Sequence, residues 1–179
     1  MDVVDRLLDN NTAYAAGYTD PGLSARPTKR VAVVTCMDAR LDVHEMLGLR
    51  LGDVHVLRNA GGVVTDDTIR SLTVSQRLLG TRAVVVIHHT DCGLLLVTDA
   101  GFRQDVYEAT GHWPTWDVGA FTDLEVDVRE SVRRLEHCPF LPHRDRIRGL
   151  VHDVRTGRLH PVTSGRLGHL DEDVSPKNS

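Results

Sequence analysis

Two short apolar runs constrain this chain more than any other feature, because each ends on residues that can bind a metal. Val31–Cys36 ends on a cysteine, and the run 83–87 leads into His89 and Cys92. Runs of four to eight β-branched apolar residues bounded by polar or glycine positions are typical of buried strands. Cys36, His89 and Cys92 should therefore lie at the carboxyl ends of two strands, the edge of a parallel sheet at which sites are built.

The three residues at these strand ends predict a zinc site. Two thiolates and one imidazole form the donor set of a catalytic zinc with one open position, whereas a structural zinc normally has four protein ligands. Cys36, His89 and Cys92 are thus the predicted ligands of Zn²⁺, and attack by a bound hydroxide is the predicted chemistry. The bland alternative is two small buried cysteines and a core histidine. Three cysteines do not form a disulfide framework in a chain of this size.

The order of the expected elements predicts how the two runs meet. Residues 53–58 read as a strand, and residues 41–49 and 66–79 as helices that join it to the two apolar runs. Right-handed crossovers then give a parallel βαβαβ unit. With the third strand on the far side of the first, the order begins 2-1-3 and Cys36 faces His89 and Cys92 across the switch point.

The whole chain is expected to form a single α/β domain. Its predicted sheet is mostly parallel, of order 2-1-3-4 with an antiparallel edge strand from 147–154 and 158–162, and it is flanked by helices. A length of 179 residues suits one domain with a sizeable core. We expect residues 1–163 to be a zinc-dependent catalytic domain with an N-terminal helical arm, and residues 164–179 to be a flexible polar tail.

Several helices can be placed from their patterns. The arm, residues 3–18, has an apolar stripe and is expected to dock on the body or on a partner subunit. Further helical segments are expected at 94–98, 102–109 and 123–135.

Charge and hydropathy exclude some partners. The net charge is −4 with both signs interspersed, which argues against a nucleic-acid surface. No apolar run approaches the roughly 20 residues that span a bilayer, and the N-terminus lacks the basic and apolar regions of a signal peptide. A cytoplasmic protein without nucleic-acid or membrane partners is therefore predicted.

The ordered motifs resemble a known family. CxDxR at 36–40, RNAG at 58–61 and HxxCG at 89–93 are together similar to the β-class carbonic anhydrases, over residues 30–95. The resemblance implies zinc on the three predicted ligands, a dyad of Asp38 and Arg40 beside it, and a homodimer or dimer of dimers whose interface borders each site. The Gly61–Gly62 pair and the IHHTDC run at 87–92 look most similar to a small bacterial branch that includes a carbonyl sulfide hydrolase.

Roles for the neighbouring residues follow from their chemistry. Asp38, held by Arg40, can accept the hydrogen bond of the hydroxide or can itself occupy the open position. The glycine turn is expected to line the substrate pocket through Ala60, Gly61, Gly62 and Val63. It carries neither GxGxxG nor GxxxxGK[ST], so a nucleotide site there is disfavoured.

Further residues near these motifs are candidates for the pocket wall and for proton transfer. Val64 and Leu94 are further candidates for an apolar wall, and His44 or His88 could relay protons. His88 should point to the opposite side of its strand from His89, so a structural use of His88 is favoured.

The predicted function is zinc-dependent, reversible hydration of carbon dioxide to bicarbonate and a proton by zinc-bound hydroxide. One alternative is hydrolysis of carbonyl sulfide or carbon disulfide at the same site. Another is a non-enzymatic zinc or redox-sensing module in which Cys36 and Cys92 form a disulfide. A thiol phosphatase is excluded, because Arg40 follows Cys36 too closely for a Cys-x5-Arg loop.

Overall fold

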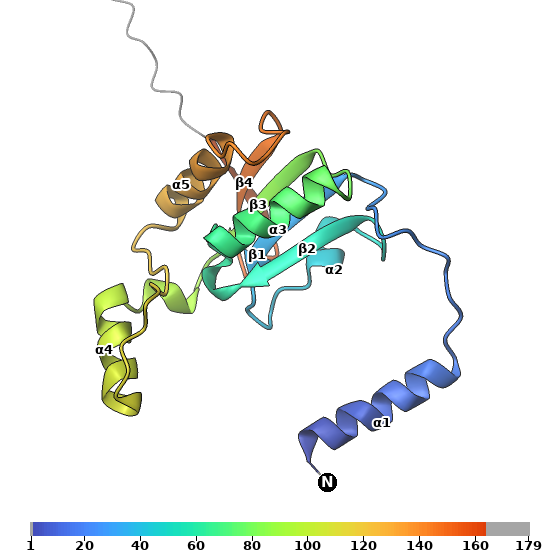
Figure 1. Ribbon diagram of the computed structural model, residues 1–179, viewed down its shortest axis with the longest axis horizontal. Helices are drawn as coiled ribbons and strands as arrows, with labels where there is room; N and C mark the ends of the chain where they lie inside the picture. Colours follow the sequence, from blue (N-terminus) through green and yellow to red (C-terminus); the bar gives the residue numbers. More distant parts are fainter. Residues whose placement is uncertain (1, 164–179) are drawn as a thin grey trace, which may run out of the picture.

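The predicted sheet is present in the computed structural model, which describes residues 2–163 (Figure 1). In these residues five strands form one sheet of order β2-β1-β3-β4-β5, with parallel pairs from β2 to β4 and an antiparallel pair between β4 and β5. The strands are β1 (Val31–Cys36), β2 (Val54–Asn59), β3 (Ala83–His89), β4 (Ile147–His152) and β5 (Leu159–Val162). The α/β fold, the order 2-1-3-4 and the antiparallel edge strand are thus confirmed.

Five α-helices and two short 3₁₀ turns complete the described part of the chain. The helices are α1 (Val3–Ala16), α2 (Val43–Leu47), α3 (Asp66–Arg77), α4 (Asp99–Thr110) and α5 (Leu124–Glu136), and the turns are η1 (Ala60–Gly62) and η2 (Gly93–Leu95). The helix expected at 94–98 is wrong. The chain there makes only η2, and Thr98 caps α4 by accepting the Gly101 N–H at 3.1 Å, so the helix begins after this residue.

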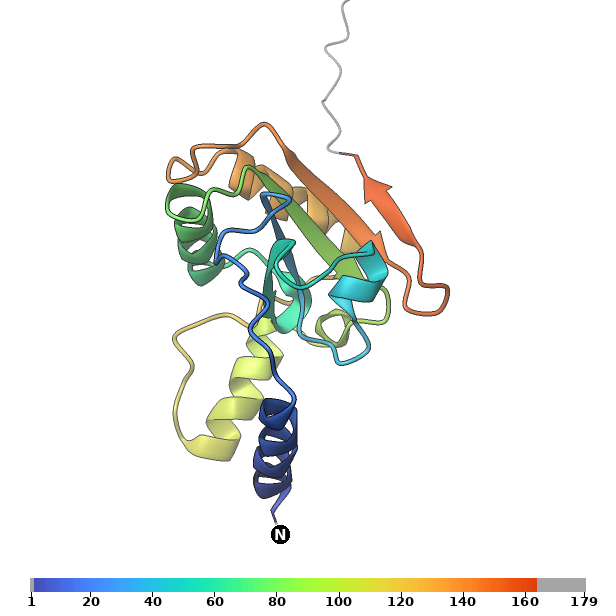
Figure 2. The ribbon, with the colours of Figure 1, turned by 90° about the vertical axis from the view of Figure 1, so that its right-hand side faces the viewer.

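Both faces of the sheet pack against helices, which explains why its strands are continuous apolar runs. On one face, α3 and α5 cover Ala32 and Val34 through side chains such as Leu72 and Leu135. On the other face, α2 covers Val33. In Figure 2, α2 lies in front of the sheet and α5 lies behind it. Because β1 lies between β2 and β3, its last residue sits centrally at the carboxyl edge.

Helix α1 stands away from this body (Figures 1 and 2). None of its residues is buried, and Leu7 and Leu8 are 61% and 62% exposed. Docking of the arm on its own body, one of the two predicted arrangements, is therefore wrong. The apolar stripe of α1 is left without a cover from the described part of the chain.

The segment that follows β3 also extends from the sheet. In it, Tyr107 of α4 stacks on Trp113 with ring centroids 4.6 Å apart, and Phe102 packs near Trp116. The tail expected at 164–179 lies outside the described residues. No helix within 2–163 is both long enough and apolar enough to cross a membrane.

Candidate metal centre

The three predicted ligands lie together at the carboxyl edge of the sheet. The ligand atoms of Cys36, His89 and Cys92 are all within 4.8 Å of one another, and all three side chains are buried. Cys36 ends β1, His89 ends β3, and these two strands are neighbours in parallel register. The parallel pairing of β1 and β3 thus brings residues far apart in sequence to one point.

The imidazole of His89 is oriented by its own turn. Its Nδ1 lies 2.9 Å from the carbonyl oxygen of Thr90, a contact in which Nδ1–H donates to the carbonyl. This fixes the tautomer and leaves the lone pair on Nε2, which is buried and has no hydrogen-bond partner. Buried polar atoms normally find a partner, so an unpaired Nε2 beside two thiols fits a metal ligand.

The two thiols also fit a divalent metal. Cys36 and Cys92 are unbonded and 5% and 3% exposed. Burial raises the pKa of the Cys92 thiol, and the neighbouring Cys36 raises it further. A bound cation reverses this effect, because a thiol that coordinates a metal is deprotonated. Buried sulfur and nitrogen donors are the set that Zn²⁺ prefers.

Asp38 is held beside this cluster by Arg40. Arg40 Nε donates to Asp38 Oδ1 at 3.0 Å and Nη2 donates to Oδ2 at 2.8 Å, a bidentate pair. The same Oδ2 lies 3.8 Å from Nε2 of His89. The hydrogen bonds from Arg40 hold the pKa of Asp38 well below its usual range. Asp38 is therefore a carboxylate near neutral pH, and both of its oxygens are engaged by Arg40.

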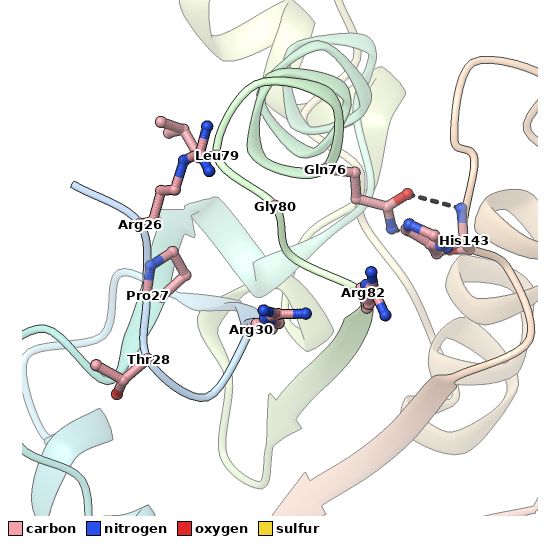
Figure 3. Close-up of a pocket in the computed structure, with 9 residues that line it drawn as sticks. All are labelled: Arg26, Pro27, Thr28, Arg30, Gln76, Leu79, Gly80, Arg82 and His143. Atoms are coloured by element: carbon pink, nitrogen blue, oxygen red, sulfur yellow. Dashed lines mark hydrogen bonds between the residues drawn. The ribbon is translucent and has the colours of Figure 1, made fainter. Parts of the chain in front are cut away.

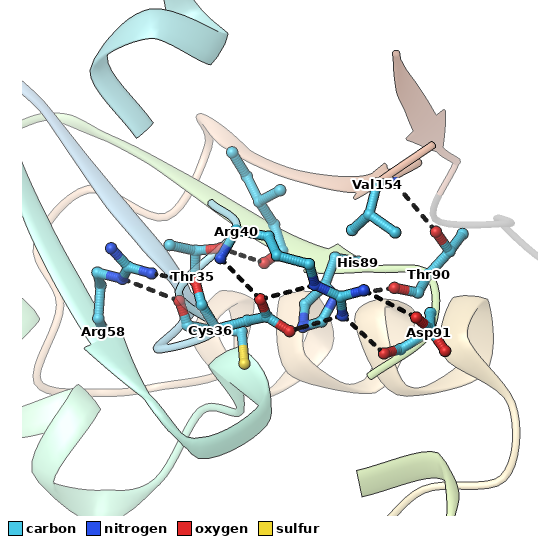
Figure 4. A network of polar contacts seen from close by, with 10 residues as sticks. Thr35, Cys36, Arg40, Arg58, His89, Thr90, Asp91 and Val154 are labelled. Carbon is cyan, nitrogen blue, oxygen red and sulfur yellow. Dashed lines mark hydrogen bonds and ion pairs between the residues drawn. The ribbon is translucent and has the colours of Figure 1, made fainter. Parts of the chain in front are cut away.

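Arg40 also joins the two loops that carry the ligands. Its Nη1 donates to Asp91 Oδ2 at 2.8 Å and its Nη2 donates to the Asp91 carbonyl at 3.0 Å (Figure 4). Asp91 lies between His89 and Cys92, in a left-handed conformation with φ 58°. Sequence reasoning missed this contact, and only the position of Asp91 inside the second ligand motif could have suggested it.

A second arginine fixes the loop after β1. Arg58 Nε donates to the Cys36 carbonyl at 3.0 Å, and its Nη2 donates to the Asp38 carbonyl at 2.6 Å. The sequence indicated Arg58 only as the first residue of the RNAG motif and predicted no role for it. The contacts show that it holds the backbone on both sides of Met37, and so the spacing of Cys36 and Asp38.

The glycine turn presses closely on the cysteine strand. A Cβ at Gly62 would lie 2.8 Å from the backbone nitrogen of Cys36, and one at Gly61 would lie 2.5 Å from a methyl of Leu94. Both residues have a positive φ, which is 73° at Gly61 and 74° at Gly62. Only glycine meets both conditions. Ala60, half buried, begins this turn.

An apolar cluster encloses the two cysteines. Its buried members besides Cys36 and Cys92 are Leu41 and Phe121, and the partly buried residues packed against it are Val63, Leu94, Leu95, Leu124 and Val154. Val63 and Leu94 were expected near the site. Leu41 and Phe121 were not expected there. Phe121 lies in an irregular loop, where no periodic pattern of apolar residues could have indicated its position.

The other predicted residues lie in different surroundings. His88 is fully buried on the opposite side of β3, with Nε2 2.9 Å from Asp127 Oδ2 and its ring edge-on to Phe121. His44 lies on α2 and is exposed. Cys138 is buried in the core cluster under α5, away from the other two cysteines.

Known proteins are similar to this chain in sequence and in fold. A family model described as carbonic anhydrase matches residues 31–116. The chain is 52% identical to beta-carbonic anhydrase 1 of Mycobacterium tuberculosis over 91% of this chain and 99% of that protein. It resembles the crystal structure of a carbonic anhydrase from Streptococcus mutans with a TM-score of 0.85 and 44% identity, covering 91% and 99% of the two chains. A carbon disulfide hydrolase of an Acidianus strain is 32% identical over 88% of this chain and 89% of that protein.

The identity extends over nearly the full length of these relatives and includes the segment that carries the donor cluster. The chain therefore belongs to the β-carbonic anhydrase family.

Proposed function

We propose that this chain is a zinc-dependent carbonic anhydrase that interconverts carbon dioxide and water with bicarbonate and a proton. The observation that carries the proposal is the buried donor cluster of Cys36, His89 and Cys92 beside the Asp38–Arg40 pair. It occurs in a chain that shares half of its residues with proteins named β-carbonic anhydrase 1.

The proposed roles follow from the contacts. Cys36, His89 and Cys92 are the residues that would hold Zn²⁺. When bound, Zn²⁺ supplies Lewis acidity that lowers the pKa of a coordinated water toward neutrality. Asp38 accepts a hydrogen bond from the attacking oxygen and orients it, because its Oδ2 lies nearest to the donor cluster. Arg40 holds this carboxylate in place, which favours orientation over occupation of the metal by Asp38.

The apolar cluster around the cysteines suits a substrate with weak polar contacts. We assign the pocket wall to the turn 60–63, comprising Ala60, Gly61, Gly62 and Val63, together with Leu94 and Phe121. These groups offer carbon dioxide an apolar surface and exclude bulk water from the reaction.

Carbon disulfide hydrolysis is the second candidate, because relatives of that name are 28–34% identical to this chain. Nucleophilic attack on either linear substrate needs the same residues, so the pocket shape decides, through roughly 1–3 kcal/mol for a difference in size. A zinc or redox module without activity is the remaining alternative.

A direct comparison of substrates tests the proposed activity. We expect purified, zinc-loaded protein to have a higher kcat/KM for carbon dioxide hydration than for hydrolysis of carbonyl sulfide or carbon disulfide. Stopped-flow pH measurements and sulfide release, run on the same preparation, give the three values. A higher kcat/KM for either sulfur substrate would reassign the substrate, and no turnover of any of the three would favour the non-enzymatic module.

We further propose that the chain acts in the cytoplasm as a homodimer, which could pair again into a dimer of dimers. The exposed stripe of α1 carries Val4, Leu7 and Leu8. The sheet face covered by α2 also keeps partly exposed apolar residues, among them Val54 and Val56. A second copy of the chain would cover both surfaces at once, since apolar patches of this kind mark interfaces.

Charges placed on the α1 stripe test this dimer. We expect the double variant Leu7→Asp/Leu8→Asp to run as a monomer in light scattering coupled to size exclusion, because a buried interface does not tolerate unpaired charge. The matched control is Asn10→Asp/Ala13→Asp, which adds two carboxylates to the same helix away from the stripe. Dimers of equal mass in both variants would contradict the role of α1.

A further inference from the structure

The strongest unexplained feature lies at the edge of the sheet opposite the cysteines. A cavity of about 460 Å³ opens there between the segment before β1, the end of α3 and the segment before β4 (Figure 3). Its lining carries three guanidinium groups and one imidazole and no carboxylate. The lining residues are Arg26, Pro27, Thr28, Arg30, Gln76, Leu79, Gly80, Arg82 and His143.

The arginines of this cavity have no carboxylate partner in the described part of the chain. Among residues 2–163, none of Arg26, Arg30 and Arg82 forms an ion pair. The nearby carboxylate of Asp53 does not serve them, because it accepts from Thr28 Oγ1 at 2.8 Å and pairs with Lys29 at 3.8 Å. Unpaired arginines are notable in a chain whose net charge is −4, since carboxylates outnumber cations elsewhere.

Backbone hydrogen bonds bring Arg30 and Arg82 side by side in the fold. The Arg30 carbonyl accepts the N–H of Arg82 at 2.7 Å and that of Ala83 at 3.3 Å, so the starts of β1 and β3 are tied at this point. Arg30 also has a φ of 55°, a conformation uncommon for a residue with a side chain. Like charges on neighbouring residues repel, so an anion bound between them would lower the energy of this arrangement.

The remaining wall is rigid. Gln76 is buried, and its side-chain amide makes two hydrogen bonds to the backbone of His143, donating from Nε2 at 2.9 Å and accepting at Oε1 at 3.0 Å. The Figure 3 view places Arg26 on one side of the Gly80 turn, Arg82 and His143 on the other, and Arg30 below it. The cationic groups therefore surround a fixed, concave space rather than lying on a flat surface.

We propose that this basic pocket is a binding site for a small phosphate-bearing anion. Guanidinium groups bind phosphate oxygens through paired N–H donors, and several of them around one cavity suit a ligand with more than one negative charge. The volume lies in the range of small-molecule sites and would hold a phosphate or a pyrophosphate group with part of an attached molecule. The site lies at the opposite strand ends from the zinc donors and does not depend on the proposed activity.

Calorimetric titration with inorganic phosphate and pyrophosphate at fixed ionic strength tests the site. We expect saturable binding of one ion per chain, tighter for pyrophosphate. The double variant Arg30→Gln/Arg82→Gln should weaken pyrophosphate binding at least about tenfold, because it removes two charge-assisted pairs. Arg158→Gln is the matched control, since this exposed arginine in the β4–β5 connection has no ion pair in the described residues and lies outside the pocket. It should change the affinity by less than about twofold.

Three results with the wild type, the double variant and the control would overturn the proposal. These are no saturable binding by the wild type, unchanged binding in the double variant, which would place the ion outside this pocket, and an equal loss in Arg158→Gln, which would indicate general surface charge. A single variant, Arg82→Lys, guards against misfolding of the double variant. It keeps the charge but loses the planar fork, so we expect weaker binding, and wild-type affinity in it would also contradict the site. Carbon dioxide turnover, measured separately, does not enter these outcomes.

Discussion

Replacing Cys36 by Ser, His89 by Ala or Cys92 by Ser is expected to remove most of the bound zinc and to lower carbon dioxide hydration on the order of 100-fold or more. Among residues 2–163 the cluster holds three protein donors, so the loss of any one of them leaves too few ligands to retain the metal tightly. Zinc content per chain, measured by mass spectrometry, and stopped-flow hydration rates give the two results for each variant.

The chain offers a matched control for this experiment. Cys138 is buried like the two cluster cysteines but lies in the core under α5. Cys138→Ala should keep full zinc and nearly full turnover, although its thermal stability will fall because of the cavity. Stoichiometric zinc in all three cluster variants would exclude the assigned ligands. Loss of zinc in Cys138→Ala as well would point to general destabilisation instead.

The second large effect is expected at Asp38. Asp38→Ala should keep zinc but reduce kcat on the order of 100-fold, because it removes the acceptor that orients the attacking oxygen and no ligand atom. Arg40→Lys should also impair turnover, since an ammonium group cannot hold the carboxylate with two parallel hydrogen bonds. Zinc analysis beside steady-state kinetics separates this outcome from a loss of metal.

An ordinary surface ion pair provides the control for the dyad. Glu125 pairs with Arg129 one turn later on α5, and neither residue has a role in the site. Glu125→Gln should leave turnover unchanged and alter stability by at most about 1 kcal/mol. Wild-type kcat in Asp38→Ala would show that Asp38 is only structural.

The ionisation of Asp38 gives this prediction a pH signature. Its pKa is depressed by the hydrogen bonds from Arg40, so the carboxylate is charged near neutral pH and loses its pairing only as the pH falls far below the usual range for aspartate. A rise of turnover with pH near neutrality therefore does not report Asp38. In Arg40→Lys the same profile should keep its midpoint while its plateau falls.

The sequence by itself determined the sheet and the residues that meet at its edge. Apolar runs identify β1 and β3, because a strand that is buried on both faces needs apolar side chains throughout. The right-handed crossovers of parallel units then predict that these two strands are neighbours in the sheet. The sequence therefore predicted that Cys36, His89 and Cys92 lie close together. The residue types by themselves favoured a zinc site over buried cysteines and a core histidine.

Contacts between irregular segments were decided only by the tertiary structure. Asp91 as a partner of Arg40, Phe121 beside the cysteines and the meeting of Arg30 with Arg82 leave no periodic signal, since each depends on where a loop returns to the sheet. Helix α1 does have a clear periodic signal, but this signal is not sufficient. Its apolar stripe predicts that one face is buried, and it does not predict which surface covers that face. Periodicity specifies what must be buried, whereas the packing of distant segments specifies against what.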